Sequence, residues 1–417
     1  MAASVPCLSL ALSSVRMLRP LAFLLVLLVA PAVGAQGALV VYGDTVYTMA
    51  GAPVVDGAVV VRDGRIVEVG PAGRVSVPSG AREVRGVVVT PGLVDARSTV
   101  GLSGLLNQPQ DQDALDRGGP LQPSLRAMDA YNARDELVEW LLALGVTTVH
   151  TGHSPGALAA GQTTIVKTAY PTVDAALVDS TTMMAMTVGP SVSQYFDDPG
   201  TRARAVAEIR SALYDALAYE RSQRGDEPPP RDLDKEAMAA VVTGRMPALI
   251  SANRAQDILS VLRLAREFPQ MDLVLSGGAE AHLVLDEIVA AGVPVILHPT
   301  MARAGGEREA LAFDTAAKLH ERGVPFAIQS GYEAYVPKTR VVLFEAAIAG
   351  AYGLGRVPAL EAVTIDAARI LGLDDRLGSL EPGKDADLVV FDGDPLETVT
   401  HVCTVVVDGR VVREDCF

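Results

Sequence analysis

Candidate reactive side chains lie at the ends of short apolar runs in this chain of 417 residues. Arg97 belongs to the run TPGLVDARST, His153 to VHTGHSPG, and His298 to VILHPT. A guanidinium can bind a carboxylate through two parallel hydrogen bonds, and a histidine can serve as a base or a ligand near neutral pH. We therefore expect Arg97, His153 and His298 to carry any catalysis, while a structural ion pair remains the alternative for Arg97.

Further polar side chains end or follow similar runs and could bind a ligand. The candidates for substrate binding are Thr99, His150, Lys167, Ser251, Asn253, Glu280 and Glu333. Hydroxyl, amide and carboxylate groups supply hydrogen bonds, and a lysine can bind an anion. Each has a structural alternative: His150 as a hydrogen-bonded core residue, Glu280 as a helix cap, and Glu333 as a solvated turn charge.

Both ends of the chain have the pattern of antiparallel sheet. Residues 38–71 alternate β-rich runs with turns around Asp63-Gly64, and the C-terminal runs do the same around Asp408-Gly409. Asp-Gly between two β-rich runs is a typical hairpin turn. Cys403 and Cys416 flank the second turn, where a disulfide and two unpaired thiols are both open alternatives.

The middle of the chain has a different pattern. Apolar β-runs at 146–151, 247–251, 271–277, 293–299 and 324–330 alternate with helical stretches such as 255–268 and 280–292. Such alternation is typical of a parallel sheet. The span 90–375 is close to the roughly 250 residues of a (β/α)8 TIM barrel. We expect an α/β fold.

The N-terminus indicates export. Arg16 and Arg19 precede the apolar stretch 21–30, and small residues follow at Val33 and Ala35. This is the pattern of a secretory signal peptide, residues 1–35, that starts at Met1 or Met17 and is cleaved after Ala35. An uncleaved anchor is the alternative. We expect a periplasmic or secreted protein with no stable membrane span after cleavage, because the rest of the chain has no comparable segment.

Composition excludes one class of partner. The formal net charge is −15, with 50 acidic and 35 basic residues. Nucleic-acid binding requires clustered Lys and Arg, so we expect a small-molecule ligand and no nucleic acid.

The chain resembles the amidohydrolase superfamily, and imidazolonepropionase-like members in particular. The resemblance rests on TPGLVDA, GVTTV (145–149), ISANRAQDI (250–258), GGAEAHLVLDEIVAAGVPVIL (277–297) and LGLDDRLGSLEPGKDADLVVFDGDP (371–395). It covers residues 38–417. It implies a TIM barrel at 90–375 and a small β-sandwich built from residues 36–89 and 376–417. Homodimers are common among such barrels.

The resemblance also implies zinc or a similar divalent metal at the mouth of the barrel, but the ligand positions have changed. The His-x-His pair of the first barrel strand falls on Arg97 and Thr99, the later histidine on Ser251, and the aspartate on Ser330 or Gly331. Arginine has no acceptor atom and cannot ligate a metal. We therefore assign no metal ligand, and the cofactor remains unknown.

Two functions follow as expectations. The first is a hydrolase of carbon–nitrogen bonds in non-peptide or peptide-like compounds, with an atypical site that lacks the His-x-His pair. The alternative is a catalytically degenerate barrel that acts as a small-ligand binding or scaffold protein. The substrate itself does not follow from the sequence.

Overall fold

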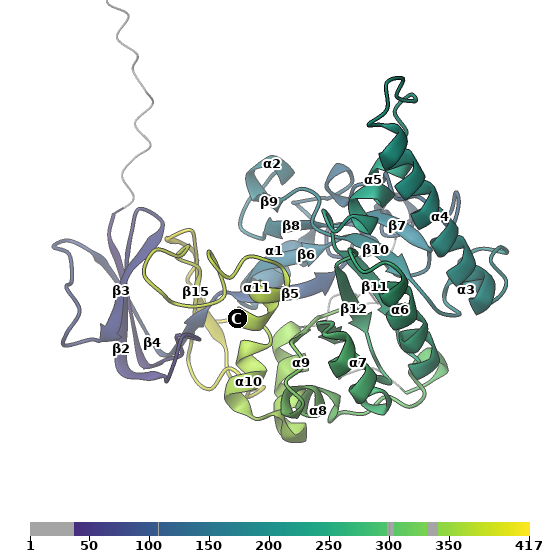
Figure 1. The fold of residues 1–417 in the computed structure, drawn as a ribbon. Coiled ribbons are helices and arrows are strands. Elements are labelled where there is room, and N and C mark those ends of the chain that lie inside the picture. The colour runs from purple at the N-terminus through teal and green to yellow at the C-terminus, as the bar shows by residue number, and fades with distance from the viewer. Residues whose placement is uncertain (1–36, 107, 298–299, 301–303, 332–340) are drawn as a thin grey trace, which may run out of the picture. The chain divides into compact units, whose positions relative to one another are not determined.

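The computed structural model describes residues 37–106, 108–297, 300, 304–331 and 341–417. Among these residues the strands form three sheets and the fold is mixed α/β (Figure 1). The predicted signal peptide lies outside the described residues.

The first sheet contains strands from both ends of the chain, in the order β17-β16-β15-β4-β1-β2-β3. Its strands are β1 (Leu39–Val46), β2 (Val54–Arg62), β3 (Arg65–Pro71), β4 (Arg82–Pro91), β15 (Leu388–Phe391), β16 (Val402–Val407) and β17 (Arg410–Arg413). β4 pairs with β1 in parallel and with β15 antiparallel, so it joins the two chain ends.

Two Asp-Gly hairpins shape this sheet. Asp63 and Asp408 both have positive φ angles, of 51° and 47°, and each is followed by a glycine with positive φ. This is the backbone geometry of the two-residue turn that the sequence predicts. The two turns lie against each other, since a Cβ added to Gly409 would be 2.8 Å from the Cα of Gly64.

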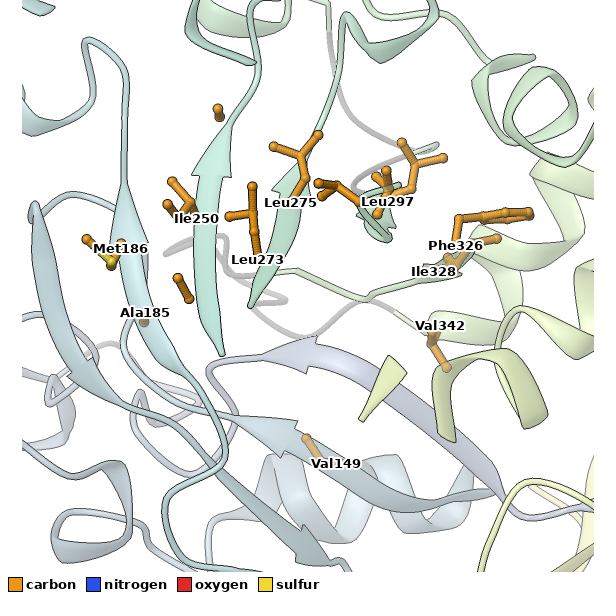
Figure 2. Close-up of a cluster of buried hydrophobic side chains, with 14 of the residues drawn as sticks. Val149, Ala185, Met186, Ile250, Leu273, Leu275, Leu297, Phe326, Ile328 and Val342 are labelled. Atoms are coloured by element: carbon orange, nitrogen blue, oxygen red, sulfur yellow. The ribbon is translucent and has the colours of Figure 1, made fainter. Parts of the chain in front are cut away.

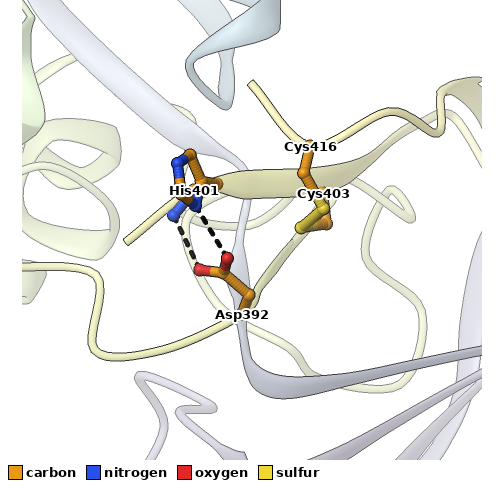
Figure 3. Close-up of a disulfide and its surroundings, with 4 residues drawn as sticks. All are labelled: Asp392, His401, Cys403 and Cys416. Carbon is orange, nitrogen blue, oxygen red and sulfur yellow. Dashed lines mark hydrogen bonds and ion pairs between the residues drawn. A yellow bond between two sulfur atoms is a disulfide. The ribbon is translucent and has the colours of Figure 1, made fainter. Parts of the chain in front are cut away.

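Cys403 and Cys416 form a disulfide, which settles the pairing that the sequence left open. Figure 3 shows it beside the pair of Asp392 and His401. The bond ties the C-terminal tail to β16, and the Phe417 amide also donates to the carbonyl oxygen of Val402 at 2.9 Å.

The other two sheets contain the middle of the chain. One has the order β14-β13-β12-β11-β10-β7, and the other β5-β6-β8-β9. The first comprises β7 (Ala159–Gln162), β10 (Met184–Thr187), β11 (Ala248–Ala252), β12 (Leu273–Gly277), β13 (Val295–Leu297) and β14 (Phe326–Ile328). The second comprises β5 (Leu93–Ser98), β6 (Val146–Thr151), β8 (Thr164–Lys167) and β9 (Leu177–Asp179).

Backbone contacts connect these two sheets at both edges. Thr163, between β7 and β8, donates to Met183 at 2.8 Å and accepts from Thr182 at 2.9 Å. At the other edge, the Gly331 amide donates to the Arg97 carbonyl at 3.1 Å. The neighbours β10 to β14 run parallel to one another, as do β5 and β6.

The segment β7–β8 runs antiparallel to both of its neighbours, β6 and β10. The sequence pattern predicts a parallel arrangement throughout, so the structure differs here. The connection of residues 152–158 is the cause, because a parallel crossover requires about a dozen residues or more.

Helices flank the strands of the middle region (Figure 1). The α-helices are α1 (Glu136–Ala143), α2 (Val173–Ala176), α3 (Val192–Tyr195), α4 (Arg202–Ser222), α5 (Leu233–Val242), α6 (Ala255–Glu267), α7 (Leu285–Ala291), α8 (Thr315–Glu321), α9 (Val342–Ala349), α10 (Arg356–Glu361) and α11 (Ile365–Ile370). Short helical turns lie at Pro109–Asp111, Ala127–Asp129, Ala281–Leu283, Gly306–Arg308 and Gly350–Leu354. Asp135 and Asp232 cap α1 and α5 by accepting from backbone amides, as the side chains of N-cap residues do.

Alternate side chains of the strands pack into two different clusters. Leu273 and Leu275 join the large cluster between strands and helices that Figure 2 shows, whereas Val274 joins a second cluster. On β14, Phe326 likewise joins the large cluster and Ala327 the second cluster. Both faces of these strands are therefore buried, which explains their almost continuous apolar sequence. Within the described part of the chain, every helix is too short or too polar to cross a bilayer.

Candidate functional site

Arg97 lies on β5 with only 2% of its surface exposed. Its guanidinium donates to the carbonyl oxygen of Ser98 at 3.3 Å and to that of His153, so it links β5 to the loop after β6. Burying a cation is costly unless hydrogen bonds replace its water. These carbonyl contacts provide part of that replacement.

Asp95 and Ser330 connect β5 to the end of β14. The hydroxyl and the amide of Ser330 both donate to Asp95, the amide at 3.0 Å. Complete burial raises the pKa of Asp95 to about 6, although Ser330 and Arg97 oppose the shift. Sequence reasoning missed Asp95; its signal was a lone carboxylate inside a buried apolar strand.

His150 is a hydrogen-bonded core residue, the structural alternative that the sequence left open. It is fully buried on β6, with Nδ1 at 2.8 Å from the Ala96 oxygen and Nε2 at 2.6 Å from the Thr163 hydroxyl. Burial, with the charge of Arg97, lowers its pKa to about 3. Nδ1 must donate to the carbonyl, so Nε2 of the neutral ring accepts from Thr163. Both nitrogens are occupied, which argues against substrate binding.

His153 is also buried, with 5% exposure, but its ring nitrogens have no hydrogen-bond partner among the described residues. Its ring lies against Gly161, where an added Cβ would be 2.5 Å from Nε2. Burial and then the charge of Arg97 lower its pKa to about 4. His153 is therefore a neutral imidazole beside a fixed cation.

A pocket of about 360 Å³ opens at the carboxyl ends of β10 and β11. Its lining is rich in hydroxyl and amide groups. The lining residues are Ser154, Pro155, Thr187, Ser191, Gln194, Tyr195, Ser251, Asn253, Gly305, Gly306, Glu307 and Arg308. Two predicted residues, Ser251 and Asn253, meet here, and the loop that carries His153 contributes the next two residues. Arg97 and His153 themselves are not among the lining residues.

Glu307 is the carboxylate of this pocket among its described lining residues. It accepts from the Ser191 amide at 2.6 Å and lies 3.5 Å from the Asn253 amide nitrogen. Sequence reasoning missed Glu307, because its segment carries no strand pattern that would place it near Ser251.

Two of the predicted substrate-binding residues, Glu280 and Thr99, have other positions. Glu280 accepts from the Ala255 amide at 2.8 Å, at the start of α6, which is the capping role left open as its alternative. The Thr99 hydroxyl lies 3.5 Å from that of Ser103. Neither residue lines the pocket.

Lys167 lies at the opposite end of the strands and is not brought together with Arg97. Its ammonium contacts Asp385 at 3.2 Å, Asp387 at 3.3 Å, and Asp408, all from the C-terminal sheet region. Lys167, predicted to bind substrate, therefore lies away from Arg97, because β8 is antiparallel and its carboxyl end points the other way. His298 and Glu333 lie outside the described residues.

The described side chains do not fit the divalent metal that the resemblance implies. Arg97 and Thr99 hold the positions of the His-x-His pair, and Gly331 has no side chain. The Ser330 hydroxyl is taken by Asp95. No cluster of three or more His, Cys, Asp or Glu residues suited to a metal is found within the described residues.

Comparison with known proteins gives consistent matches. The family model described as "Amidohydrolase family" matches residues 313–412. The chain is 27% identical to amidohydrolase tasK of Hapsidospora irregularis over 86% of its own length, but spans only 40% of that protein. It is 26% identical to an imidazolonepropionase of Sphingopyxis alaskensis, covering 83% of this chain and 89% of that one.

The similarity extends to solved structures. An amidohydrolase from Thermotoga maritima is 30% identical, with a TM-score of 0.84, and the match covers 90% of this chain and all (100%) of that chain. The sequence identity and the shared fold both extend over nearly the whole length of the two proteins. On this evidence the chain belongs to the amidohydrolase family.

Proposed function

We propose that this protein hydrolyses carbon–nitrogen bonds of small non-peptide or peptide-like compounds in the pocket at the ends of β10 and β11. Family membership supports the reaction class. The observation that carries the site is the position of Glu307, a carboxylate held among hydroxyl and amide donors inside a concave pocket. Such pockets with a few convergent polar groups are typical of small-molecule sites.

We also propose that the middle region forms a barrel of eight strand positions. The order β5, β6, β7–β8, β10, β11, β12, β13 and β14 returns to β5 through Ser98 and Gly331. Val94, Leu249, Val274, Ile296 and Ala327 from five of these strands share one buried cluster, which fits an enclosed barrel interior. In a barrel of this kind the site lies at the carboxyl ends of the strands, where the pocket is.

The chemistry assigned to Glu307 is that of a general base. One carboxylate oxygen is fixed by the Ser191 amide, which orients the group toward the pocket wall shared with Asn253. A positioned carboxylate can take a proton from water as the water attacks a carbonyl carbon. The Ser251 hydroxyl then donates to the developing oxyanion, and Glu307 passes the proton taken from water to the leaving nitrogen as the C–N bond breaks.

Replacing Glu307 tests this assignment. Glu307→Gln keeps the shape of the side chain but removes the base, so hydrolysis should fall by about 100-fold or more. The measurement is amine or ammonia release from a panel of N-acyl amino acids, dipeptides and cyclic amides, with kcat determined for every compound turned over.

Glu309→Gln is the matched control, because Glu309 lies two residues away and its side chain is 74% exposed in an ion pair with Arg254. It should retain the activity of the unchanged protein. Equal activity in Glu307→Gln would contradict the role given to Glu307.

The second candidate function is ligand binding without turnover. It is favoured by the end of β14, where Ser330 is committed to Asp95 and Gly331 lacks a side chain, so neither of these two described residues offers a carboxylate. The same panel separates the two functions. Compounds that raise the melting temperature and are never hydrolysed would establish binding and overturn the hydrolase proposal.

A further inference from the structure

We infer that Arg97 supplies a built-in cation at the end of β5 in place of a divalent metal, and that this part of the site works metal-free. The inference does not depend on whether the pocket hydrolyses its ligand. It rests on how the side chains around Arg97 are already engaged.

The guanidinium is held as a fixed structural charge. It is tethered to the carbonyl oxygens of Ser98 and His153, which belong to β5 and to the loop after β6. A guanidinium stays charged at any physiological pH, and it has no lone pair to offer a metal. A divalent ion placed beside it would meet a cation that cannot give up its proton.

His150 cannot act as a ligand in this arrangement, and His153 has only its buried Nδ1 to offer. A metal-bound imidazole needs a free ring nitrogen directed at the ion. Both nitrogens of His150 are engaged, with Ala96 and Thr163. The Nε2 side of His153 is packed against Gly161, close to where a Cβ would stand.

Electrostatic effects on these histidines agree with a resident positive charge. Arg97 lowers the pKa of both His150 and His153, second only to burial. It also opposes the burial-induced rise in the pKa of Asp95. One guanidinium thus acts on three buried titratable groups, as a metal ion would.

Paramagnetic Mn²⁺ tests whether a metal binds there. The ring protons of His150 and His153 would be followed by NMR in the isotope-labelled full chain while MnCl₂ is added, with exposed His401 as the internal control. We expect His150 and His153 to broaden no more than His401 at any Mn²⁺ concentration. Selective broadening that saturates near one equivalent would overturn the inference.

Removal of the charge provides a second measurement. Arg97→Met should raise the pKa of the His153 ring toward its ordinary value, whereas Arg97→Lys, which keeps a cation, should leave it low. An unchanged pKa in Arg97→Met would show that Arg97 is not the acting cation. If Arg97→Met fails to fold, the Mn²⁺ titration of the unchanged protein still tests whether a metal binds beside Arg97.

Discussion

Arg97 affects the protonation of two other buried titratable side chains, Asp95 and His153. Arg97 stays charged, so the neutral form of His153 and the ionised form of Asp95 are both favoured by its presence. Burial also favours the neutral form of His153, by lowering its pKa as Arg97 does. For Asp95 burial has the opposite effect to Arg97, because it raises the pKa of the carboxyl group. The balance leaves a neutral imidazole near a fixed cation at neutral pH.

This balance predicts how His153 affects stability in acid. Its pKa is about 4 in the folded protein against 6.5 as its ordinary value. Below pH 6.5 the unfolded chain binds a proton that the native state does not, so stability is lost as the pH falls toward 4. His153→Gln should reduce this acid-induced loss by about 2–3 kcal/mol, measured by urea unfolding at pH 7 and pH 4.

His401→Gln serves as the control for that comparison, because His401 is exposed and hydrogen-bonded to Asp392 (Figure 3). It should leave the acid-induced loss nearly unchanged. The same loss in His153→Gln as in the unchanged protein would show that His153 is protonated normally in the fold.

Sequence reasoning at this scale singled out Ser251 and Asn253, which line the pocket, and Arg97 and His153, which do not, because each follows or ends a recognisable strand. It missed Glu307, which only the folding of the chain brings within 3.5 Å of Asn253. It also could not decide between ligand binding and hydrogen bonding for His150, since the partners, Ala96 and Thr163, come from other segments.

At the scale of elements, the reversed segment β7–β8 has the largest consequence. It carries Lys167 to the end of the strands that faces the C-terminal sheet, where three aspartates surround the ammonium. Arg376 reinforces the cluster by contacting Asp385 at 3.0 Å. Burial raises the pKa of Asp387 to about 6, and the charge of Lys167 opposes that rise.

Lys167→Met should destabilise the protein by about 3–5 kcal/mol, because it leaves buried carboxylates without their central cation. The measurement is the free energy of unfolding in urea at pH 7. Lys318→Met is the matched control: Lys318 is partly exposed and pairs with Asp314 one helical turn away, so about 0.5 kcal/mol is expected.

Similar losses for the two variants would mean that the cluster around Lys167 contributes no more than a surface ion pair.

Strand locations were predictable from apolar runs, including β6, β11, β12, β13 and β14. The direction of β7–β8 was not, because apolar periodicity marks a strand without giving its orientation.

Across the whole molecule, both chain ends build one sheet while the middle builds the region that holds the pocket. Sequence patterns predicted this division, since the Asp-Gly hairpins at the two ends and the alternating pattern between them are local features. The assembly of the site was less predictable, because it depends on contacts between segments far apart in the sequence, such as Asp95 with Ser330 and Asn253 with Glu307.

The central claim is that a fixed guanidinium replaces the metal of this family at the end of β5. The most direct test is anomalous X-ray diffraction, recorded at the zinc edge, from crystals of the full chain grown with excess Zn²⁺. The account predicts no anomalous density beside Arg97, with its guanidinium hydrogen-bonded to the carbonyl oxygens of Ser98 and His153. A zinc peak coordinated by side chains at the ends of β5, β11 and β14 would contradict it.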